Sequence, residues 1–205
     1  MLTFFFASRT CALATHIALV DAGAAYELRR VDFASGEQQS PAYRAVNPKG
    51  RVPALVTPHG VLTETPALLA YLAQSFPAAG LAPLDAPFAF GEIQAFNSYL
   101  SSTVHVAHAH GPRANRWADD PAAQAAMKAK VPQSVGAAFA LIEEGLLKGP
   151  FVMGTTYSIA DPYLFTVARW LEGDGVDTAR LPRVMAHRAM MAVRPSVLRA
   201  LAEEA

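Results

Sequence analysis

Residues 46–56 read Val-Asn-Pro-Lys-Gly-Arg-Val-Pro-Ala-Leu-Val, two prolines and a glycine followed by a short apolar run. Because proline and glycine interrupt regular structure, we expect a shaped loop that enters a strand at residues 54–56. The dipeptide His59-Gly60 then predicts a turn, and residues 61–63 predict a second strand that pairs back as a hairpin. This part of the chain therefore contains antiparallel β structure.

The segments on either side of this hairpin predict a mixed α/β unit. Leu2–Ala7 is rich in phenylalanine and fits a buried strand, and Cys11–Ala22 has the apolar spacing of a helix that ends at a glycine. Tyr26–Phe33 predicts another strand, whereas residues 35–44 are polar and show no clear periodicity. After the hairpin, Thr65-Pro66 predicts a helix start, because threonine caps helices and proline tolerates the first helical position.

The character of the sequence changes after this unit. Residues 76–87 hold three prolines, a glycine and no periodicity, which indicates a linker. Beyond it strand signals disappear, and the sequence predicts five helices, at Phe88–Ala109, Pro121–Leu147, Ile159–Glu172, Pro182–Met191 and Ser196–Glu204. We therefore expect a first domain at residues 1–77, a linker at 78–87 and an all-helical domain at 88–205.

Composition limits the classes of function. The chain has 205 residues, of which 52% are hydrophobic and 17% charged, with a formal net charge of zero. A core of ordinary size is expected, and nucleic acid is not an expected partner because such proteins usually carry a basic excess. No apolar run approaches the roughly 18 residues of a membrane span, so no membrane partner is expected either. The single cysteine, Cys11, cannot form an internal disulfide and favours a reducing, cytoplasmic location.

Five short motifs lie along the chain in a fixed order, at Phe4–Cys11, Asn47–Pro53, Leu62–Ala67, Ser158–Tyr163 and Arg194–Val197. In order and spacing they resemble the glutathione transferase superfamily over essentially the whole chain. The resemblance implies an α/β thioredoxin-like N-terminal domain of order βαβαββα and an all-α C-terminal helical domain. Cys11 together with His105 is most similar to the bacterial beta class.

Three side chains are candidates to contact the sulfur of glutathione. Conjugation requires the thiolate, and the N-terminus of a helix stabilises an anion through its free N–H groups and partial positive charge. Ser8, Thr10 and Cys11 lie at or just before such a terminus. The alternative for Cys11 is a buried structural cysteine, and for Ser8 and Thr10 it is ordinary helix capping.

The resemblance also assigns residues to the rest of glutathione. Val52 would present its backbone to the cysteinyl group, with a cis bond to Pro53. Glu64 could pair with the γ-glutamyl ammonium, and the Thr65 hydroxyl at a helix start could hold the neighbouring carboxylate. By resemblance His105 lines the substrate side of the cleft, and a core histidine is the alternative.

His105, His108 and His110 also raise the question of a metal site. Residues 105 and 108 can share a helical face, but His110 cannot easily join them and no nearby acid completes a ligand set. We therefore expect no metal.

The predicted function is that of a cytoplasmic detoxification enzyme. As a homodimer with glutathione as co-substrate, it would conjugate the glutathione thiolate to a small apolar electrophile, and thiol-disulfide or peroxide reduction are further reactions that the resemblance allows. The alternative is a non-catalytic ligand-binding or regulatory protein of the same architecture. Intact Val52, Glu64 and Thr65 favour retained glutathione binding in either case.

Overall fold

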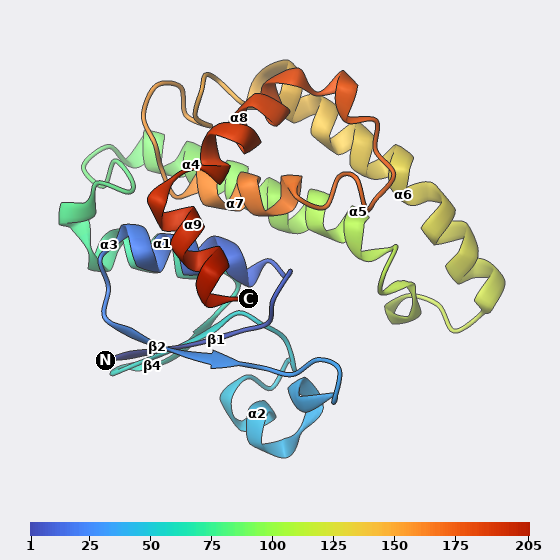
Figure 1. Cartoon of the computed structure of the whole chain (residues 1–205), viewed down its shortest axis with the longest axis horizontal. Coiled ribbons are helices and arrows are strands. Elements are labelled where there is room, and N and C mark those ends of the chain that lie inside the picture. Colours follow the sequence, from blue (N-terminus) through green and yellow to red (C-terminus); the bar gives the residue numbers. More distant parts are fainter.

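The computed structural model describes all 205 residues and consists of an α/β part followed by a helical part (Figure 1). The sheet has the order β2-β1-β3-β4, in which β1 pairs parallel with β2 and antiparallel with β3, and β3 and β4 form a hairpin. The predicted βαβαββα order is confirmed. Its elements are β1 (Leu2–Phe6), α1 (Ala12–Asp21), β2 (Tyr26–Arg30), α2 (Pro41–Val46), β3 (Ala54–Thr57), β4 (Gly60–Thr63) and α3 (Thr65–Ser75).

The sheet separates α2 from the other helices (Figure 1). Alternate residues of β1 point to opposite faces. Phe4 and Phe6 are buried on the face that α1 covers, where both rings approach His16. Phe5 meets Tyr43 of α2 edge to face, with ring centroids 5.7 Å apart. The phenylalanine-rich first strand is thus a central strand that helices cover on both faces.

The structure defines one segment that the sequence left open and corrects one prediction. The polar residues 35–44 contain a short 3-10 turn and the start of α2, where the Ser40 hydroxyl accepts a hydrogen bond of 3.1 Å from the Tyr43 N–H. Thr65 is not a helix cap, because α3 already includes it and Glu64 occupies the cap position without a side-chain cap bond. The Thr65 side chain is buried against the site described below, so it does not serve the helix end.

The second part is entirely helical, as predicted. A turn of π-helix at Leu100–Val104 joins α4 to α5, and another at Ile142–Leu146 extends α6, so each pair corresponds to one predicted helix. Every residue of α7 is buried, which makes it the central helix of this part. The helices are α4 (Pro87–Tyr99), α5 (His105–Ala109), α6 (Pro121–Leu141), α7 (Ala160–Ala168), α8 (Pro182–Ala192) and α9 (Pro195–Glu203).

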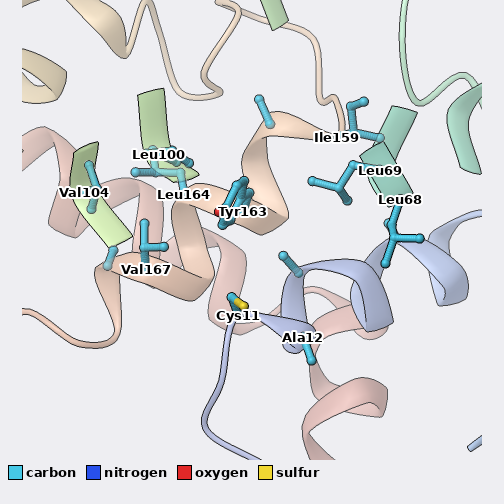
Figure 2. Packing of buried hydrophobic residues seen from close by; sticks show 14 of the residues in the cluster. Cys11, Ala12, Leu68, Leu69, Leu100, Val104, Ile159, Tyr163, Leu164 and Val167 are labelled. Atoms are coloured by element: carbon cyan, nitrogen blue, oxygen red, sulfur yellow. The ribbon is translucent and has the colours of Figure 1, made fainter. Parts of the chain in front are cut away.

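One hydrophobic core joins the two parts. A cluster of 38 buried residues runs from the sheet through α1 and α3 into α4, α6 and α7. Figure 2 shows Leu68 and Leu69 of α3 packed toward Ile159 at the start of α7. The connecting segment is held too, because the Ile159 N–H donates to the Leu81 carbonyl at 2.9 Å. No helix combines the length and apolar character needed to cross a membrane.

Candidate functional site

A cleft of about 400 Å³ lies between the α/β part and the helical part. This volume falls in the range usual for small-molecule sites. The α/β part contributes the turn before α1, the loop at residues 50–53 and the start of α3, and the helical part contributes α5, residues 113–117, Tyr163 and Trp170. Of the predicted site residues, Thr10, Cys11, Val52, Pro53, Glu64, Thr65 and His105 all line this cleft.

Cys11 occupies the position just before α1, and Figure 2 shows its sulfur between α1 and Tyr163 of α7. The residue is 8% exposed, and its Sγ lies 3.8 Å from the Val52 carbonyl oxygen. Burial raises the pKa of the Cys11 thiol, and the Thr65 hydroxyl and the positive charge of Arg113 lower it to a smaller extent. The side chain is therefore a neutral thiol at neutral pH.

The two predicted hydroxyl candidates have other partners. The Ser8 hydroxyl donates to the backbone carbonyl of Glu204 at 2.6 Å, and Ser8 does not line the cleft. The C-terminus thus engages Ser8, and the structure does not bring it to the sulfur site. Thr10 lines the cleft, but its hydroxyl donates to the Ala7 carbonyl at 2.7 Å and accepts from the Ala12 N–H at 3.3 Å. This is the local bonding of a helix start.

Hydrogen bonds and a close backbone contact hold the loop before β3 in place. The Val52–Pro53 bond is cis, as predicted, and both residues are buried. The Arg51 carbonyl accepts hydrogen bonds from the Asn47 side-chain amide at 2.6 Å and from the Tyr43 hydroxyl at 2.7 Å. Gly50 has φ +60°, and a Cβ at this position would lie 2.8 Å from the Gln38 carbonyl oxygen. This close approach excludes any residue but glycine, and the backbone of Val52 is held at the cleft.

Glu64 and Thr65 form the end of the cleft at the start of α3. Glu64 has φ 74°, in the left-handed region, and its carboxylate lies 2.5 Å from the Lys49 Nζ. Lys49 also donates to the Thr63 hydroxyl at 2.6 Å. Thr65 is only 4% exposed, whereas the Glu64 side chain reaches solvent. The free N–H groups of the first turn of α3 and one carboxylate therefore lie together.

His105 lines the cleft from the helical part. Its ring centroid lies 5.1 Å from that of Trp170. Burial lowers the pKa of His105 to about 4, and the positive charges of His108, Arg113, Arg116 and Arg51 act in the same direction. The imidazole is therefore neutral over the physiological range.

Sequence reasoning missed several cleft residues. His108 was considered only as a metal ligand, yet its Nδ1 lies 2.8 Å from Asp174 and its ring stacks on Trp170 at 4.3 Å. Its spacing of three from His105 was the available signal. Four arginines also line the cleft, Arg113 and Arg116 from one segment and Arg9 and Arg51 from two others, and no sequence pattern connects the three segments. The structure contains no group of three or more His, Cys, Asp or Glu side chains placed to hold a metal ion.

Comparison with known proteins agrees with this geometry. Residues 2–74 match the family model described as "Glutathione S-transferase, N-terminal domain", and residues 121–189 match "Glutathione S-transferase, C-terminal domain". Glutathione S-transferase GstA of Escherichia coli O157:H7 is 32% identical over 98% of this chain and 97% of its own.

Two solved structures extend this likeness. A glutathione transferase homologue from Sulfitobacter with bound glutathione is 45% identical, with a TM-score of 0.96 over 99% of this chain and 98% of that one. The beta class glutathione S-transferase of Sphingomonas chungbukensis is 32% identical, with a TM-score of 0.85 over 98% of each chain. Both matches cover the cleft and both parts of the fold. The chain belongs to the glutathione S-transferase family.

Proposed function

We propose that this enzyme is of the bacterial beta class, binds glutathione in the cleft and conjugates its thiolate to an electrophile. The observation that carries the proposal is the convergence of Cys11, Val52, Glu64 and Thr65 with His105 in one cleft. The Sulfitobacter homologue with bound glutathione supports the choice of co-substrate.

The two ends of glutathione match different parts of the site. The γ-glutamyl carboxylate would accept hydrogen bonds from the first turn of α3, and its ammonium would pair with Glu64. Glu64 would leave Lys49 to do so, which costs little because an exposed ion pair is worth about 0–1 kcal/mol. The cysteinyl backbone would pair with the backbone of Val52, and this places the glutathione sulfur beside Cys11.

The protein's own thiol would then act as a hydrogen-bond donor. Because burial keeps Cys11 protonated, its S–H can donate to the glutathione sulfur and favour the thiolate form of the co-substrate. The N-terminus of α1 and Arg113 add positive potential. The glutathione sulfur forms a bond to the electrophilic carbon, the leaving group departs with the electron pair of its bond, and the thiol proton goes to solvent.

Calorimetry and mass spectrometry test this proposal. Wild type and Cys11→Ala should both bind glutathione, with no glutathione adduct on wild type, and Glu64→Gln should bind at least about tenfold more weakly. An adduct on wild type would assign Cys11 to thiol-disulfide chemistry. Binding without turnover of any electrophile would leave a ligand-binding protein, and absence of binding would overturn the proposal.

We also propose that the enzyme is a cytoplasmic homodimer. Exposed apolar side chains support the dimer, namely Val61 of β4 (43% exposed), Leu84 (38%) and Phe88 of α4 (83%). Light scattering should give twice the chain mass for wild type and the mass of a monomer for Phe88→Glu.

The single cysteine supports the proposed location, because a protein without disulfides suits a reducing compartment.

A further inference from the structure

The cleft gathers four arginines that have no acidic partner. Arg9, Arg51, Arg113 and Arg116 all line it, and none has an acidic partner within ion-pair distance. Six other basic side chains do make ion pairs, namely Arg29–Glu27, Lys49–Glu64, Lys148–Glu92, Arg188–Glu172, Arg194–Asp21 and Arg199–Glu203. Glu64 is the single acid among the cleft-lining residues, and Lys49 neutralises it.

Three of these guanidinium groups, those of Arg51, Arg113 and Arg116, lie close enough to oppose one another. The pKa of Arg116 is lowered by partial burial and by the charges of Arg113 and Arg51. The same three charges act on His105, which places them around one region of the cleft. Cations brought together without counter-ions repel, so an anion that enters the cleft gains free energy from every one of them.

Glutathione accounts for only part of this charge. One of its two carboxylates belongs at the start of α3, so a single carboxylate is left for the arginine cluster. The positive charge also continues beyond the glutathione site. A neighbouring cleft of about 730 Å³ shares Arg9, Thr10, His108 and Trp170 and adds Lys128 and Arg169, neither of which makes an ion pair. The only acid in its lining, Asp174, already binds His108.

We propose that the second substrate is an anionic electrophile, a molecule that carries a carboxylate or similar oxyanion as well as its reactive carbon, and that Arg116 and Arg9 bind this oxyanion. This inference rests on the proposed function and replaces the expectation of an apolar electrophile. Trp170 and Trp117 supply aromatic faces for the carbon skeleton. The bond changes are those of conjugation, with a new C–S bond, loss of the leaving group with its electron pair and release of the thiol proton.

A matched pair of substrates tests the inference. The probes are 4-chloro-3,5-dinitrobenzoate and its methyl ester, which lose chloride to the same thiolate and differ in charge. Wild type should show a KM for the benzoate about tenfold below that for the ester, the order of one charge-assisted hydrogen bond. Before turnover rates are compared, each is divided by the uncatalysed rate of the same probe. Added salt should raise the KM of the benzoate and leave that of the ester nearly constant.

Single substitutions locate the effect. Arg116→Gln and Arg9→Gln should each raise the KM for the benzoate about tenfold and change the KM for the ester much less. Arg180→Gln is the matched control, because Arg180 is exposed, makes no ion pair and lies outside the cleft. Calorimetry with glutathione alone should give the same affinity for Arg180→Gln as for wild type, and a much smaller change for Arg116→Gln and Arg9→Gln than their change in the KM for the benzoate.

The outcomes separate the inference from the function on which it rests. Equal corrected rates and KM values for the two probes, or an Arg116→Gln loss of glutathione affinity as large as its change in the KM for the benzoate, would overturn the anionic substrate and leave the transferase intact. Absence of glutathione binding, or binding without turnover of either probe, would overturn the proposed function itself.

Discussion

Cys11 is a thiol enclosed by the start of α1, Val52 and Thr65, and this environment determines its reactivity. Because burial raises its pKa, the fraction present as thiolate at neutral pH is small. We predict that iodoacetamide alkylates native Cys11 more slowly than the urea-unfolded chain, because a raised pKa lowers the fraction of thiolate at a given pH. Mass spectrometry after timed quenching measures both rates.

Restricted access alone could also slow this reaction, so the dependence on pH is the decisive readout. A raised pKa moves the midpoint of the rate profile to higher pH, whereas steric protection lowers the rate without moving the midpoint. A midpoint at or below that of the unfolded chain would contradict the neutral thiol.

His105 makes stability depend on pH in a defined direction. Its pKa is about 4 in the folded protein, below the ordinary value of 6.5, so the unfolded chain binds more protons between these two values. Stability therefore falls as pH falls from about 6.5 toward about 4. Urea unfolding at about pH 7 and about pH 4.5 should show a smaller loss for His105→Gln than for wild type. The exposed His59 provides the control, and an equal benefit from His59→Gln would contradict the assignment.

Asp161 in the first turn of α7 organises several segments of the helical part. Its buried carboxylate accepts from the Val152 N–H at 2.8 Å and the Ser158 N–H at 2.7 Å, and lies 3.1 Å from the His187 Nε2. We predict that Asp161→Ala lowers the free energy of unfolding by about 3 kcal/mol or more, because several buried partners lose their acceptor together.

The exposed cap of α6 is the matched control for this change. Asp120 accepts hydrogen bonds from the N–H groups of Ala122 and Ala123, and its replacement by alanine should cost about 1 kcal/mol. Urea unfolding followed by circular dichroism measures both variants. Equal losses for Asp161→Ala and Asp120→Ala would mean that Asp161 is only a surface cap.

Sequence patterns were sufficient where an element depends on its own residues. Phe4 and Phe6 indicated a buried strand, and the turn at His59-Gly60 between two short apolar runs predicted the hairpin of β3 and β4. Patterns failed where a residue's role depends on a distant partner. Ser8 looked like a site residue, but its partner is Glu204, which lies 196 positions along the chain. The charge of the cleft was hidden for the same reason, because its arginines come from loops that only the fold brings together.

The C-terminus connects the two parts at the level of the whole molecule. His16 of α1 is fully buried and lies 2.9 Å from Glu203 and 3.0 Å from Glu204. The Tyr26 hydroxyl donates to Glu203 at 2.8 Å. The C-terminal end of the chain therefore binds α1, the helix that follows Cys11, and so connects the helical part to the α/β part.

This connection and the shared core predict that the two parts unfold together. The sequence supplies a native probe for each, because its single cysteine lies in the α/β part, and both tryptophans, Trp117 and Trp170, lie in the helical part. Tryptophan fluorescence and pulsed labelling of Cys11 across a urea series should give one midpoint, since the 38-residue cluster leaves neither part with a core of its own. Cys11 that becomes reactive at lower urea, while the fluorescence stays native, would show that the α/β part opens first and that the cleft is a hinge between independent units.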